Sequence, residues 1–215
     1  MHNELLEKLM DDPKVLYIYE IGLQIYGLFE NVEDRDFLVI VDNNYNIQEK
    51  EISENGYNFL FTTIKDWFEQ VLNNSLLAWK CACLPKKYIH KEHVKLMLQT
   101  NPLLLRKEFD TKNKQILSEI DSLFEYGNTI TAQKKLFELL EYLVFANQII
   151  ENHKIVNFKT LKDYYKIIVD GQVINKENII NTYKTLASKE LLNFKNSTDS
   201  ILMASKIKKI IQNKK

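Results

Sequence analysis

The feature that most constrains the fold is a change in hydrophobic spacing near residue 85. Before this point, short runs rich in β-branched and aromatic residues alternate with turn signals, which predicts strands over residues 15–21, 37–41 and 57–63. After it, apolar residues recur at intervals of three and four, which predicts helices. We therefore expect an α+β protein, with a small sheet and flanking helices in residues 1–85 and an all-helical unit in residues 86–215.

Turn and cap residues define the limits of the expected helices. Pro13 ends a first helix over residues 3–10, because proline lacks the amide donor that a helix needs. Thr63 is expected to cap a helix over residues 64–72. Further helices are expected over residues 75–83, 102–126, 132–152, 158–169, 176–192 and 200–211, with Asn196 and Ser197 separating the last two.

Composition excludes several classes of protein. The chain has 215 residues, 45% hydrophobic and 27% charged, which is typical of a globular protein with a real core. A formal net charge of +0 argues against a globally basic surface for nucleic acid. Two cysteines are too few for a disulfide framework, and no apolar run approaches the length of a membrane span. We expect a cytoplasmic protein with no membrane partner.

An acidic pair stands at the start of the second expected strand. Because side chains two apart share a strand face, Asp34 and Asp36 would point the same way. Gly22 and Gly27, two of only five glycines, mark a turn just upstream. Two carboxylates beside such a turn suit Mg²⁺ or Mn²⁺ carrying a nucleoside triphosphate. The alternatives are a solvated turn for the aspartates and turn geometry alone for the glycines.

This pattern, over residues 22–41, resembles the signature of the DNA polymerase β-like nucleotidyltransferase superfamily, in which Gly-Ser precedes Asp-x-Asp at a strand start. It looks most similar to the stand-alone nucleotidyltransferases of bacteria and phages, and looser similarity extends through residues 63–72, 77–88 and 133–149. The resemblance implies Mg²⁺-dependent transfer of a nucleoside monophosphate from a triphosphate to a hydroxyl of RNA, a protein or a small molecule.

The resemblance also implies a set of metal ligands. Asp34 and Asp36 would bind the metal and carry catalysis, and the position of the third carboxylate of the family falls at Asn58. An amide can ligate through its oxygen but carries no charge and cannot act as a base. With a different register of the strands, Glu51 or Glu54 would supply the third carboxylate instead.

Phosphate contacts are implied in the same way. Gly22, Leu23 and Gly27 would hold the triphosphate through backbone amides. Lys134 and Lys135, near the start of a long helix, would contact its phosphates, and solvated helix surface is the alternative for these lysines.

Three positions depart from the family pattern. Leu23 stands where the family has serine, Asn58 where it has a carboxylate, and Lys80 where it has glutamate. An active enzyme with altered chemistry is one reading of these changes. The alternatives are a catalytically degenerate module that binds a nucleotide, RNA or a protein, and a helical interaction protein in which Asp-x-Asp is a relic.

A basic group follows the third helix of the sheet region. It consists of Lys86, Lys87 and Lys91, with Tyr88 and His90 between them. Such a group is a candidate contact for RNA, although neutral proteins carry many patches of this size.

Overall fold

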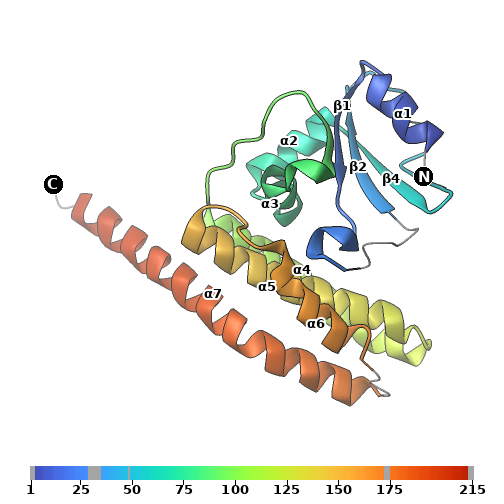
Figure 1. The fold of residues 1–215 in the computed structure, drawn as a ribbon. Helices are drawn as coiled ribbons and strands as arrows, with labels where there is room; N and C mark the ends of the chain where they lie inside the picture. Colours follow the sequence, from blue (N-terminus) through green and yellow to red (C-terminus); the bar gives the residue numbers. More distant parts are fainter. Residues whose placement is uncertain (1–2, 29–34, 48, 172–174, 213–215) are drawn as a thin grey trace. The chain divides into compact units, whose positions relative to one another are not determined.

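The computed structural model describes residues 3–28, 35–47, 49–171 and 175–212. The chain forms two compact units, Met1–Gln99 and Thr100–Lys215. The expected α+β architecture is confirmed, because the first unit holds a mixed sheet with helices and the described part of the second is helical (Figure 1). Strand β5 (Ile89–Glu92) pairs with β1, so the sheet-bearing unit continues past residue 85.

The sheet contains five strands in the order β3-β4-β2-β1-β5. Among the described strands, only β2 and β4 run parallel, and the other neighbouring pairs are antiparallel. The three strands predicted from apolar runs are confirmed, whereas the charged edge strand β5 has no apolar run to reveal it. The first four strands are β1 (Val15–Glu20), β2 (Arg35–Val41), β3 (Glu51–Glu54) and β4 (Tyr57–Thr63).

Alternation along the strands divides the sheet into two apolar faces. Phe37 belongs to the face that α1 (Glu4–Asp11) covers. Tyr19 belongs to the opposite face, where its ring lies 6.3 Å from that of Trp67 on α2 (Ile64–Leu72). Figure 1 shows α1 on one side of the sheet and α2 on the other. Both faces are therefore buried, as a sheet between two helical layers requires.

Local capping starts the two helices on the α2 side. The hydroxyl of Thr63 accepts a hydrogen bond from the amide of Asp66 at 3.2 Å, which confirms the predicted cap. The hydroxyl of Ser75 accepts from the amide of Ala78 at 3.2 Å and starts α3 (Leu76–Cys83). Each cap satisfies an amide that lacks a partner within its helix, so local sequence determines where these helices begin.

The second unit is built around one central helix, α5 (Thr129–Asn152), which packs against α4, α6 and α7. Its apolar residues spaced at three and four are buried, as predicted. None of the described helices is both long and apolar enough to cross a membrane. The other elements of the unit are α4 (Pro102–Glu125), η3 (Phe158–Thr160), α6 (Leu161–Ile168) and α7 (Lys176–Gln212).

The predicted break at Asn196 and Ser197 is wrong, because α7 continues through it without interruption. Phe194 and Thr198 flank the pair four residues apart, and both are completely buried. Packing on this face outweighs the turn preference of two polar residues, of which Asn196 is exposed to solvent.

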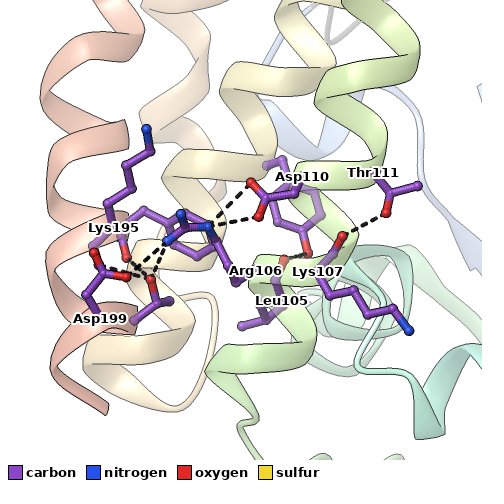
Figure 2. Close-up of polar contacts among 10 residues, drawn as sticks. Leu105, Arg106, Lys107, Asp110, Thr111, Lys195 and Asp199 are labelled. Carbon is purple, nitrogen blue, oxygen red and sulfur yellow. Dashed lines mark hydrogen bonds and ion pairs between the residues drawn. The ribbon is translucent and has the colours of Figure 1, made fainter. Parts of the chain in front are cut away.

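A polar contact joins α4 to α7 in this unit (Figure 2). Arg106 of α4 donates from Nε to Oδ2 of Asp110 at 3.1 Å and from Nη1 to Oγ1 of Thr198 at 2.8 Å. Its Nη1 also lies 3.7 Å from Oδ1 of Asp199. The buried Thr198 hydroxyl is thereby satisfied, as a polar group in a helical core must be.

Candidate functional site

Asp36 and Asn58 lie side by side at the start of the two parallel strands. They are register partners in the pairing of β2 with β4. Nδ2 of Asn58 donates to Oδ1 of Asp36 at 3.0 Å, and both residues are half-buried. The position implied for a third carboxylate is thus next to Asp36, but the group that faces Asp36 is an amide donor.

Gly22 lies against the same carboxylate. A Cβ atom at this position would be 2.5 Å from Oε1 of Gln24, 3.0 Å from Oδ2 of Asp36 and 3.2 Å from the backbone nitrogen of Asp36. The backbone of Gly22 is ordinary, with φ of −70°, so glycine is needed here for close approach and not for an unusual conformation. The glycine turn and Asp36 are therefore brought together as one site.

The turn itself is a short 3₁₀-helix, η1 (Leu23–Tyr26), closed by Gly27 in the left-handed region at φ of 71°. The amide of Gly27 donates to the carbonyl of Gln24 at 3.0 Å. The hydroxyl of Tyr88 donates to the same carbonyl at 2.8 Å, which ties the turn to the segment before β5. The turn is fixed from both sides, while triphosphate binding by the Leu23 amide stays a prediction.

The other member of the acidic pair, Asp34, lies outside the described residues. Within the part of the chain that is described, no group of three or more His, Cys, Asp or Glu side chains could hold a metal ion. Mg²⁺ is, however, commonly bound by one or two carboxylates together with substrate phosphates. The Asp36 carboxylate, half-buried beside a glycine turn, fits one such ion, whereas the amide at Asn58 does not supply the charge for a second.

Arg35, between the two aspartates, points to the opposite face of β2. Both carboxylate oxygens of Glu20 accept hydrogen bonds from its guanidinium, through Nε at 3.0 Å and through Nη2. The guanidinium also lies 5.3 Å from the centroid of the Phe37 ring. With Arg35 held on this face, strand alternation turns Asp36 toward the other.

Glu20 is the residue of this region that sequence reasoning missed. It is only 1% exposed, and Nε2 of His90 lies 3.3 Å from its Oε2. Burial by itself raises the pKa of Glu20, but the hydrogen bonds from His90 and Arg35 outweigh burial and hold the pKa below its usual value. The signal in the sequence was a carboxylate at the end of an apolar strand, since a buried charge needs a partner.

Strand β3 shows where the alternative carboxylates lie. Ser53 is the register partner of Asn58, whereas Glu54 is the partner of Tyr57 and so faces the other side. Glu51 is the partner of Leu60, two residues further along β4, and is exposed. Neither glutamate occupies the position next to Asn58.

Lys134 and Lys135 belong to the second unit, near the start of α5. Lys134 is exposed, and Nζ of Lys135 forms an ion pair with Oε2 of Glu119 at 2.9 Å. This pair joins α5 to α4, which gives Lys135 a role within the helical unit. A contact of either lysine with triphosphate stays a prediction.

Lys80 lies beside the glycine turn. It is carried by α3, and its Nζ is 5.5 Å from the centroid of the Tyr26 ring at the end of η1. The departure from the family pattern at this position thus places a cation next to the candidate site.

Two members of the basic group at residues 86–91 are held in contacts within the first unit. His90 turns inward to Glu20. Nζ of Lys91 donates to the carbonyls of Met10 and Asp12, both at 2.7 Å, and so fastens the end of α1. The register of β5 against β1 shifts between Ile18 and Tyr19, so the side chains of His90 and Lys91 do not alternate regularly, and both contact groups on the α1 side of the sheet.

A cavity of about 390 Å³ lies on the face of the sheet opposite Asp36. Its lining includes Leu9 of α1, Ile52 of β3 and Phe61 of β4, all part of or packed against the core cluster under α1. Its walls are mainly apolar, and it is separated from Asp36 by the sheet. We do not include it in the candidate site.

Comparison with known proteins does not assign the chain to a family. No family model matches the sequence, and no curated protein matches it. Among solved structures, the chain is similar to a nucleotidyltransferase-like protein from Exiguobacterium sibiricum 255-15. The identity is 14%, the alignment covers 91% of this chain and 72% of that chain, and the TM-score is 0.30. Similarity this low carries no argument about the fold family or the site of this chain.

Proposed function

We propose that the first unit binds a nucleoside triphosphate together with one Mg²⁺ or Mn²⁺ at Asp36, beside the turn from Gly22 to Gly27. Nucleotidyl transfer from this site to a hydroxyl acceptor is weak or lost, because Asn58 occupies the place of a carboxylate. The protein is on this proposal a nucleotide-binding module of nucleotidyltransferase type.

The hydrogen bond from Asn58 to Asp36 is the observation that carries this proposal. A carboxylate at residue 58 would face Asp36 at about the 3.0 Å that separates the two side chains, and two carboxylates this close are stable only with a cation or proton between them. The amide removes that need. It orients the Asp36 carboxylate through a hydrogen bond, but it cannot accept a proton from an attacking hydroxyl.

The residues around Asp36 favour binding over chemistry. Asp36 would hold the cation, which in turn supplies charge to the phosphates when it is bound. Gly22 lets the Gln24 side chain and the Asp36 carboxylate approach its backbone closely, which holds the turn against Asp36. RNA, a protein or a small molecule would be the acceptor if transfer occurs.

Binding is tested first, by titration calorimetry of the whole protein with each of the four ribonucleoside triphosphates in the presence of MgCl₂. Asp36→Asn should weaken binding at least about tenfold, which corresponds to loss of about 1.4 kcal/mol. Asp66→Asn is the matched control, because Asp66 is an exposed acid at the start of α2, at the other end of the sheet. Absence of binding by the wild type, or equal affinity in Asp36→Asn, would contradict the proposal.

Asn58→Asp then tests why transfer is weak. With α-labelled triphosphate and Mg²⁺, this variant should transfer label to itself or to added RNA at least tenfold faster than the wild type (about 1.4 kcal/mol of transition-state stabilisation). Without Mg²⁺ its thermal midpoint should fall, because two carboxylates then repel each other. If the wild type transfers label fast and Asn58→Asp does not increase the rate, the amide does not limit transfer. The protein would then be an active enzyme.

A further inference from the structure

We infer that Lys80 binds the polyphosphate of the nucleotide and makes the site selective for nucleoside triphosphates over monophosphates. This inference rests on the proposed function, because it concerns the same site. It gives Lys80, which stands where the family has glutamate, a role in binding the phosphates of the substrate.

The placement of Lys80 relative to the turn is the first step. Gly22, before η1, abuts the Asp36 carboxylate, and Tyr26, at the end of η1, lies under the Lys80 ammonium. A 3₁₀-helix rises about 2.0 Å per residue, so the four residues of η1 span about 8 Å. A cation-binding carboxylate and an ammonium thus flank one short turn. On this inference a polyphosphate contacts both groups, whereas a single phosphate contacts only the ion at Asp36.

The direction of Lys80 is set by its neighbours on α3. Trp79 and Cys81, on either side of it, are 2% and 0% exposed, and Nε1 of Trp79 donates to Oδ1 of Asn74 at 3.2 Å. These contacts fix how the helix is rotated about its axis. Lys80 is therefore held on the side of α3 that faces Tyr26, although its long side chain keeps the freedom to reach a ligand.

The contact with Tyr26 does not compete strongly with a phosphate. A cation over an aromatic ring at this distance gains little compared with a charge-assisted hydrogen bond between ammonium and phosphate. Without a ligand, the Tyr26 ring keeps the Lys80 ammonium near the turn. When a phosphate group binds, the ammonium leaves the ring and forms a hydrogen bond with the phosphate.

The charge of the described site supports the same assignment. Asn58 contributes no charge, and Asp36 is the carboxylate at the turn. Two ammonium groups lie near the turn: Lys80 over Tyr26, and Lys87 over Tyr88, whose hydroxyl contacts the turn. A bound triphosphate carries more negative charge than one divalent ion neutralises, and Lys80 offsets part of the remainder. A monophosphate held at Asp36 through the ion would gain nothing from Lys80.

Lys80→Met tests this inference, because methionine keeps the apolar stem and removes the charge. The probes are ATP and AMP, or the corresponding pair for the base that the wild type prefers, titrated into the whole protein with MgCl₂. We expect the variant to bind the triphosphate about tenfold more weakly, equivalent to about 1.4 kcal/mol, and the monophosphate with unchanged affinity. Lys80→Arg should keep most of the selectivity.

Lys65→Met is the matched control, because Lys65 is an exposed lysine of the same unit in the first turn of α2, at the far end of the parallel strands. Tryptophan fluorescence establishes that each variant is folded, and Lys80→Gln replaces Lys80→Met if the latter is not. If Lys80→Met weakens the binding of both ligands equally, or of neither, while Asp36→Asn still weakens binding at least about tenfold, Lys80 does not select triphosphates and this inference alone fails. If the wild type binds no nucleotide, the proposed function fails and the role of Lys80 fails with it.

Discussion

Glu20→Gln removes the charge at the centre of a buried contact on the face of the sheet opposite Asp36. The carboxylate of Glu20 accepts two hydrogen bonds from Arg35, and His90 donates a third. Glutamine has nearly the same shape, but one side of its amide is a donor and would face the donors of the guanidinium. The substitution therefore breaks the pair without creating a cavity.

The expected loss of free energy of unfolding depends on how deeply each partner is buried. Breaking a fully buried pair by removing one charge costs about 3–5 kcal/mol. The Glu20 side chain is 2% exposed, but that of Arg35 is 31% exposed, so water replaces part of what Arg35 loses. Because of this solvent screening we expect Glu20→Gln to lower the free energy of unfolding by about 2–3 kcal/mol.

Both tryptophans of the chain lie in the first unit, which makes the assay selective. Trp67 and Trp79 are buried, at 0% and 2% exposure. Their fluorescence in a urea titration therefore reports unfolding of the sheet-bearing unit and not of the helical one. Glu51→Gln, on the exposed edge strand β3, is the matched control and should change stability by less than about 0.5 kcal/mol.

The pH dependence of the same titration gives a second check. Since the pKa of Glu20 is lower in the folded protein than in the unfolded chain, its contribution is fully present above the unfolded pKa of about 4.3. It is lost as the pH falls through the folded pKa. The difference between wild type and Glu20→Gln should therefore shrink on acidification below about pH 4.3. A difference under about 0.5 kcal/mol at pH 7, or one that does not shrink, would refute this account of the pair.

Two further substitutions test the site and the helical unit. Gly22→Ala places a Cβ atom 2.5 Å from Oε1 of Gln24 and 3.0 Å from Oδ2 of Asp36, so the turn or the carboxylate must shift and nucleotide affinity should fall at least about tenfold (about 1.4 kcal/mol). Calorimetry that finds wild-type affinity would contradict the role of this close approach. Thr198→Val removes the hydroxyl that accepts from Arg106 and should lower the stability of the helical unit by about 1–2 kcal/mol, measured by circular dichroism at 222 nm. Thr185→Val, which removes an exposed hydroxyl from the same helix, is its control, and equal effects of the two substitutions would argue against the contact between α4 and α7.

Local sequence patterns were sufficient to predict most of the helices and strands. The apolar runs marked three strands, and Thr63 marked the start of α2, because side-chain periodicity and capping act within a few residues. The interruption predicted at Asn196 and Ser197 failed because burial of Phe194 and Thr198 outweighs a local turn preference. Strand β5 was not predicted, because a short charged segment has no apolar pattern that indicates a strand. It is a strand because it pairs with β1, which is distant in the sequence.

The sequence by itself determined the fold class, the glycine turn and the identity of the groups near Asp36. Only the tertiary structure decided how those groups face one another. Register between parallel strands, which are far apart in sequence, places Asn58 beside Asp36, and packing of α3 brings Lys80 to the turn. Periodicity specifies which face of its own element a side chain occupies, but the neighbour across that face is set by burial and strand pairing over the whole unit.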